Sequence, residues 1–93
     1  MDRDWREGEY LECLWGERHR FAWVMRRYGG MTQVEAESSA MRRYPYEQAD
    51  APHRGLIFHD EAWHWAMLRI HGERYAHERP ELAAPSAAYR ELD

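Results

Sequence analysis

Residues 11–30 read LECLWGERHRFAWVMRRYGG, and this stretch decides the fold class. Apolar residues recur in it at three- and four-residue steps, which is the spacing of one face of an α-helix. The residues on this face are Leu11, Leu14, Arg18, Phe21, Met25 and Tyr28, with Trp15 and Ala22 beside them. Gly29 and Gly30 come next, and glycine readily adopts the left-handed conformation that ends helices. We therefore predict a helix that begins at or after Trp5 and ends at the glycine pair.

A second helix is predicted from about Gln33 to Arg43. The segment Thr32-Gln33-Val34-Glu35 matches a capping box, in which the threonine hydroxyl and the glutamate carboxylate each accept a hydrogen bond from a free amide at the start of a helix. Pro45 ends this helix, because proline disfavours helical geometry at the residue before it. The residues expected on its inner face are Val34, Met41 and Tyr44.

A third helix is predicted from Asp60, whose carboxylate can cap the first turn, to about Glu78, which is followed by Pro80. Its most apolar face carries Trp63, Ala66, Met67 and Ile70, and Leu68, Gly72 and Tyr75 lie beside that face. Since this helix is apolar over much of its circumference, we expect it to be the central helix of the fold.

The segments around these helices complete the predicted architecture. Residues 44–58 contain two prolines and a glycine and show no clear period, so we expect an irregular connection that wraps over the helices. Its Leu56-Ile57-Phe58 segment is expected to hold it down. Residues 87–92 are consistent with a short helical turn. The sequence thus predicts a single all-α domain over residues 1–93, a compact bundle of three main helices with a short C-terminal helical turn.

Composition limits the classes of function. The formal net charge is -4 and no apolar run approaches the ~20 residues that span a bilayer, so we expect a soluble protein with no membrane partner. The first residues are acidic and lack the apolar stretch of a secretory signal, which favours a cytoplasmic location. Cys13 is the single cysteine, so an internal disulfide and a thiolate-rich metal cluster are both excluded.

Six histidines make a metal site the first chemical hypothesis to weigh. The strongest candidates are His59, Asp60, Glu61 and His64. The two histidines are five residues apart, whereas the zinc-protease helix motif needs a spacing of four. Asp60 or Glu61 can share a helix face with His64 and supply two ligands, but no third ligand is evident. We therefore predict no metal and no cofactor, and the alternative is a metal-dependent enzyme built on these four residues.

Arginines raise nucleic acid as a second alternative. Residues 18–43 hold six arginines against two glutamates. The doublets Arg26-Arg27 and Arg42-Arg43 lie near the ends of predicted helices, however, where cations compensate the helix dipole. In an antiparallel pair of helices the doublets also lie at opposite ends, which argues against one phosphate-binding stripe. Direct nucleic-acid binding is not expected, and a regulator that uses these doublets is the alternative.

Aromatic residues favour a protein partner. Trp63 and Trp65 lie about 200° apart around their helix, so both cannot face the same core. We expect Trp63 in the core and Trp65 either on an interaction surface, which we favour, or under the connection of residues 44–58. Trp, Tyr and Arg are the residue types that dominate binding hot spots. The predicted interaction residues are Trp23, Arg42, Arg43, Tyr46 and Trp65.

Three segments resemble short uncharacterised proteins of bacteriophages and prophages: Tyr44-Pro45-Tyr46-Glu47, residues 61–67 (EAWHWAM) and Ile70-His71-Gly72-Glu73. The resemblance covers roughly the last two thirds of the chain and includes no catalytic motif. Small, acidic, helical phage proteins are often inhibitors of host machinery, anti-CRISPR proteins among them. The resemblance therefore implies an inhibitor, by association.

These observations together predict a small cytoplasmic protein-binding module that is not an enzyme and that can also form a homo-oligomer. Its narrower form is a phage-derived inhibitor of a host defence complex such as CRISPR–Cas. In that form the acidic residues of the first helix compete for a nucleic-acid groove. These residues are Glu7, Glu9, Glu12 and Glu17.

Overall fold

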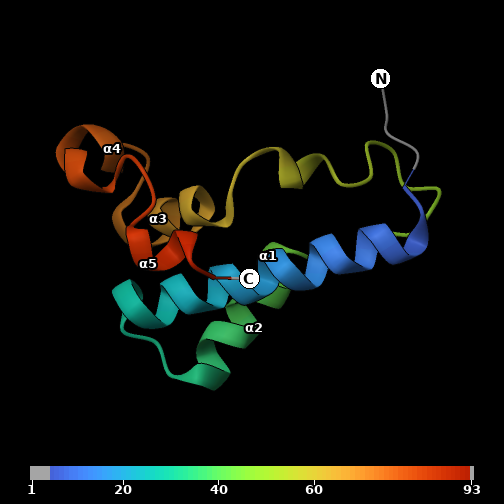
Figure 1. Ribbon diagram of the computed structural model, residues 1–93, viewed down its shortest axis with the longest axis horizontal. Helices are drawn as coiled ribbons and strands as arrows, with labels where there is room; N and C mark the ends of the chain where they lie inside the picture. The colour runs from blue at the N-terminus through green and yellow to red at the C-terminus, as the bar shows by residue number, and fades with distance from the viewer. Residues whose placement is uncertain (1–4, 93) are drawn as a thin grey trace.

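The computed structural model describes residues 5–92, and its longest element is helix α1, Glu7–Gly29 (Figure 1). The predicted end is confirmed, because Gly30 closes the helix in the left-handed conformation at φ 68°. The buried residues of α1 are Tyr10, Leu14, Phe21, Val24 and Met25, and Leu11 and Tyr28 are half-buried. The placement of Trp15 on the buried face was wrong: its side chain is 57% exposed. Trp15 is rotated by about 100° from Leu14, far enough to leave the packed stripe.

Helix α2, Gln33–Arg43, has the predicted bounds. The capping box is confirmed, because Glu35 N–H donates to Thr32 Oγ1 at 3.2 Å and Thr32 N–H donates to Glu35 Oε1 at 2.9 Å. The helix ends at the residue before Tyr44, which is buried as expected and immediately precedes Pro45.

The predicted inner face of α2 was otherwise wrong. Val34 and Met41 are 73% and 58% exposed, whereas Ala36, Ser39 and Ala40 are buried. The buried residues are all small, so the backbone of α2 can approach α1 closely. A prediction based on large apolar residues does not identify a buried face made of small residues, because close packing also depends on the shape of the two surfaces in contact.

The predicted third helix is shorter than expected and is followed by a separate turn. Helix α3, Ala62–His71, stops at Gly72, whose φ of 93° no α-helix accommodates, and the short helix α4 spans Tyr75–Glu78. Glu61, not Asp60, is the N-cap residue, and it makes no side-chain capping bond. The predicted apolar face is confirmed: Trp63, Ala66 and Met67 are buried and Ile70 is half-buried.

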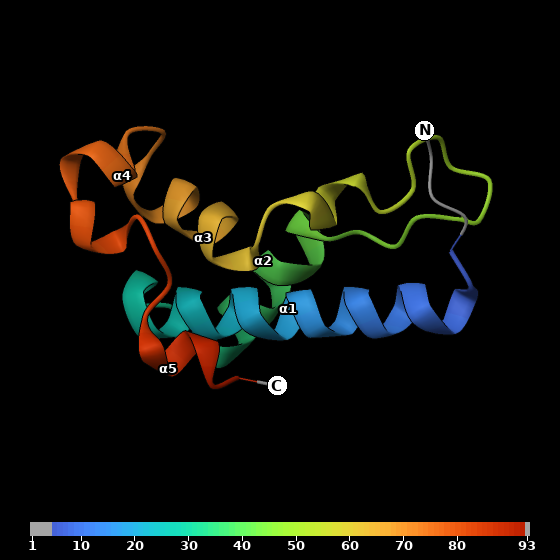
Figure 2. The same ribbon diagram turned by 45° about the horizontal axis from the view of Figure 1, so that its top comes forward.

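Helix α1 is the central element, because it packs against both α2 and α3, which corrects the expectation that the third helix is central (Figures 1 and 2). The chain then continues through a 3-10 turn η2, Pro80–Leu82, to the terminal helix α5, Ala87–Arg90, which crosses α1 (Figure 2). Tyr89 of α5 is buried in the same core. The predicted all-α bundle with a short C-terminal helix is therefore confirmed. Within residues 5–92, no helix is long and apolar enough to cross a membrane.

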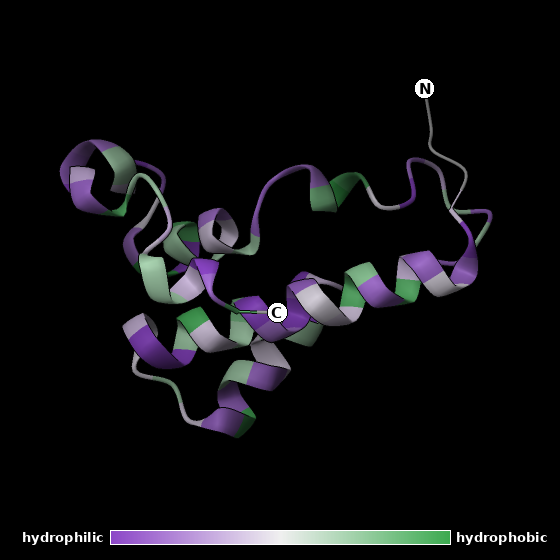
Figure 3. Ribbon diagram, viewed as in Figure 1, coloured by the Kyte–Doolittle hydropathy of each residue, from purple (hydrophilic) through white to green (hydrophobic). Residues whose placement is uncertain are grey.

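The connection between α2 and α3 runs out to the N-terminal end of α1 and returns along it (Figures 1 and 2). The 3-10 turn η1, Leu56–His59, is the hydrophobic segment of its return path (Figure 3). Ile57 and Phe58 pack against the core as expected, but Leu56 is exposed. The predicted docking of the connection is thus correct for two of the three residues.

A buried arginine fastens this connection to α1. Arg54 is only 6% exposed, and its Nη2 donates to Glu7 Oε1 at 2.7 Å. Its Nε donates to the carbonyl oxygen of Glu47 at 2.9 Å, and its guanidinium lies 3.8 Å from the centre of the Tyr10 ring. The N-terminal turn of α1 and the connection are therefore joined by a charge-assisted contact in which Arg54 is buried and the Glu7 side chain is 52% exposed.

Candidate functional site

The structure places the predicted metal-ligand candidates without bringing them into one cluster. His59, Asp60 and Glu61 are exposed, and His64 is half-buried with its Nδ1 2.9 Å from the hydroxyl oxygen of Tyr75. In the part of the chain that the structure describes, no three His, Cys, Asp or Glu side chains are grouped so that they could hold a metal ion. The structure therefore does not bring these four residues together as the ligands of one metal ion.

Trp65 packs under the α2–α3 connection. Its Nε1 donates to the carbonyl oxygen of Ile57 at 3.2 Å, and the Arg43 guanidinium lies 4.0 Å from the centre of its ring. Of the two expected positions for Trp65, the structure has the one under the connection. Arg43 lies over this ring and is half-buried, whereas Arg42 is exposed.

These contacts predict that Trp65→Ala lowers the free energy of unfolding by about 1–3 kcal/mol, less than for a fully buried tryptophan. Chemical denaturation followed by circular dichroism measures the change. An unchanged unfolding midpoint would show that Trp65 contributes nothing to the fold, and would return it to the interaction surface.

The other predicted interaction residues lie in separate parts of the fold. Tyr46 is exposed, and its hydroxyl donates to Glu7 Oε2 at 2.6 Å, at the N-terminal end of α1. Trp23 is half-buried, and its ring makes edge contacts with Tyr28 and Tyr89 near the opposite end. Positions 7 and 23 of one helix are about 24 Å apart. The predicted interaction residues thus do not form one compact surface.

An exposed apolar groove does occur between α1 and α2. It has a volume of about 380 Å³ and is lined by Trp15, Arg18, His19, Ala22, Glu37, Ala40 and Met41. Trp15 and Met41 are the large exposed apolar residues of this groove. The sequence-based prediction did not include this groove, because it placed both residues on the inner faces of their helices.

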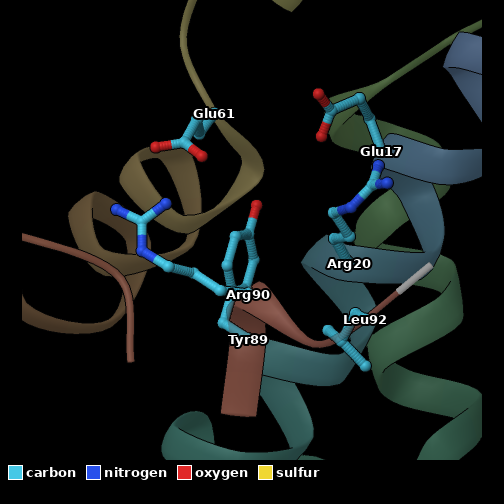
Figure 4. A pocket seen from close by; sticks show the side chains of 6 residues that line it. All are labelled: Glu17, Arg20, Glu61, Tyr89, Arg90 and Leu92. Atoms are coloured by element: carbon cyan, nitrogen blue, oxygen red, sulfur yellow. The ribbon is translucent and has the colours of Figure 1, made fainter. Parts of the chain in front are cut away.

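A second hollow of about 390 Å³ lies where α1, the start of α3 and the C-terminal helix α5 meet (Figure 4). Its lining residues are Glu17, Arg20, Glu61, Tyr89, Arg90 and Leu92. Figure 4 shows the Arg90 guanidinium on the side of Glu61 and the Arg20 guanidinium on the side of Glu17. The Tyr89 hydroxyl points between the two pairs (Figure 4). We call this hollow the mixed-charge pocket.

Glu17 is the half-buried carboxylate of the mixed-charge pocket. Burial raises its pKa above the ordinary value, although the nearby Arg20 opposes the shift. The nearby backbone N–H of Ala62 also opposes the rise in the pKa. The Oε2 atom of Glu17 is buried and has no hydrogen-bond partner among the described residues. The buried Tyr44 hydroxyl also lacks a partner there, and burial followed by the charge of Glu17 raises its pKa. Buried polar atoms are seldom left unpaired, so this region has unused hydrogen-bonding capacity.

Comparison of the chain with protein-family models, with curated proteins and with solved structures finds no match, so its own residues carry the functional argument.

Proposed function

We propose that this chain is a protein-binding module that docks its partner in the groove between α1 and α2. The observation that carries the proposal is the exposure of two large apolar side chains, Trp15 and Met41, on opposite sides of one groove. When a partner covers such residues and removes their apolar surface from water, the free energy of the system falls, which favours binding. Val34, one of the most exposed apolar residues, extends the apolar surface of α2 by about two turns from Met41.

The proposed occupant is an amphipathic helix of another protein. Ala22 and Ala40 line the groove and are small enough to admit a bulky side chain from outside. Arg18 and His19 flank it on α1, and Glu37 flanks it on α2. A helix with an apolar face, an acidic edge toward α1 and a basic edge toward α2 complements this arrangement.

The narrower proposal, a phage inhibitor of a CRISPR–Cas complex, rests on the sequence resemblance. Competition for a nucleic-acid groove by the acidic side of α1 is not part of the proposal. Glu7 is bound to Tyr46 and Arg54, and Glu17 lies half-buried in the mixed-charge pocket. These two carboxylates therefore do not join Glu9 and Glu12 in one acidic stripe.

Met41→Asp is expected to weaken partner binding at least ~10-fold, because it places a carboxylate in the apolar groove. The matched control is Leu56→Asp, which introduces the same charge at an exposed apolar residue outside this groove. Immobilised wild-type protein and both variants are compared as baits in extracts of the native cells. A protein retained by the wild type and by Leu56→Asp is then purified and titrated by calorimetry.

Two results would contradict the proposal. One is a purified partner that binds Met41→Asp as tightly as the wild type. The other comes from analytical ultracentrifugation: self-association that Met41→Asp abolishes would identify a second copy of the chain as the occupant, in place of a foreign helix.

A further inference from the structure

We propose that the mixed-charge pocket binds a free α-amino acid with an aliphatic side chain, as the zwitterion. This site is distinct from the proposed docking groove. Positions 17 and 20 lie roughly opposite positions 15, 18, 19 and 22 around helix α1, given about 100° per residue. A ligand in the pocket and a partner in the groove therefore occupy different sides of the same helix.

The arrangement of charge selects a zwitterion. The described residues give the pocket two carboxylates, Glu17 and Glu61, and two guanidinium groups, Arg20 and Arg90 (Figure 4). None of these four side chains forms a direct ion pair with another described residue. A ligand of one sign would satisfy one pair of groups and be opposed by the other. A ligand with an ammonium and a carboxylate on one carbon matches both signs and leaves the total charge of the site unchanged.

The hydrogen-bonding groups agree with this choice. The Tyr89 hydroxyl oxygen accepts a hydrogen bond from the backbone N–H of Trp63 at 3.3 Å and lies between the charged pairs, where its O–H can donate to a ligand (Figure 4). Together with the guanidinium groups it provides donors for a carboxylate. Glu17 retains an unpartnered oxygen, and an ammonium group brings three donors.

Leu92 defines the side chain that the ligand carries. Among the described residues it is the one aliphatic side chain that lines the pocket, and a volume of about 390 Å³ leaves room beyond an ammonium and a carboxylate. An aliphatic side chain packed on Leu92 removes apolar surface from water, whereas a charged side chain would add an unmatched charge. L-leucine is therefore the probe.

The test is isothermal titration calorimetry with L-leucine and its two half-molecules. Isopentylamine keeps the ammonium and the side chain, and 4-methylpentanoate keeps the carboxylate and the side chain. We expect saturable binding of L-leucine and binding of each half-molecule that is ~10- to 100-fold weaker, because each loses one set of charge-assisted hydrogen bonds.

Variants assign the two ends of the ligand. Arg20→Met and Arg90→Met should each weaken L-leucine binding at least ~10-fold while changing the affinity for isopentylamine little. Glu61→Gln should weaken the binding of L-leucine and should leave the affinity for 4-methylpentanoate unchanged or increased. Arg26→Met, an exposed arginine of α1 outside the pocket, is the control and should leave every affinity unchanged.

Circular dichroism shows that each variant is folded before it is titrated. The absence of saturable L-leucine binding to the folded wild type would overturn the proposal. So would 4-methylpentanoate binding as tightly as L-leucine, which would make the pocket an anion site, or an equal loss of affinity in Arg26→Met.

Discussion

Trp63→Ala is expected to lower the free energy of unfolding by about 3–5 kcal/mol, a large share of the stability of so small a domain. Trp63 is 2% exposed and links three parts of the fold. Its ring makes edge contacts with Tyr28 of α1 and Tyr89 of α5, at centroid distances of 5.3 and 5.5 Å. Its Nε1 donates to the carbonyl oxygen of Leu82 at 2.9 Å. Truncation leaves a cavity and also releases the C-terminal segment from the core.

Thermal unfolding followed by circular dichroism measures this effect, and we expect Tm to fall by roughly 15–30 °C. Trp15→Ala is the matched control, because it removes the same side chain from an exposed position of α1. Its expected effect on the free energy of unfolding is within about 0.5 kcal/mol. Equal destabilisation by the two substitutions would contradict the assignment of Trp63 to the core.

Arg54→Ala is expected to lower the free energy of unfolding by about 2–4 kcal/mol. The substitution removes the ion pair with Glu7 and the hydrogen bond to the Glu47 carbonyl oxygen. It also uncovers the Tyr10 ring, on which the guanidinium lies. The α2–α3 connection should separate from the N-terminal turn of α1, and hydrogen exchange of backbone amides in residues 44–56 should rise before that of the α1–α3 core.

Arg54→Lys is the control for charge alone. Lysine keeps the positive charge but loses the planar group that contacts Glu7, Glu47 and Tyr10 together, so we expect it to recover less than half of the lost stability. Recovery to the wild-type value would show that only charge matters at this position.

The same contact predicts a dependence on pH. The Tyr46 hydroxyl, followed by Arg54, lowers the pKa of Glu7 from its ordinary value of 4.5. A carboxyl whose pKa is lowered in the folded state stabilises the fold at pH values above its ordinary pKa. This contribution to stability is lost as the pH falls through the pKa of the folded state. The stability difference between the wild type and Arg54→Ala should therefore narrow below pH 4.5 in urea titrations. A constant difference down to pH 2 would contradict the ionic contribution of Glu7.

Local sequence signals determined the first two helices of this protein. The left-handed glycine at position 30 ends α1, and the reciprocal hydrogen bonds of Thr32 and Glu35 begin α2. Each signal involves groups within a few residues of one another, so no distant contact is needed to produce it. The third helix was predicted to be longer than it is, because the apolar period continues through Gly72. The helix ends there because of the backbone conformation of that glycine.

Tertiary packing decided which face of each helix is buried, and with it the position of both candidate sites. Small residues of α2, Ala36 and Ala40, face the core, and this leaves Met41 and Trp15 to form the exposed groove. The mixed-charge pocket draws its residues from α1, the start of α3 and the C-terminal segment, which are separated by more than twenty-five positions in sequence. The helical period of a sequence shows that a helix has an apolar and a polar face. The shape and close approach of the neighbouring helices decide which residues are buried.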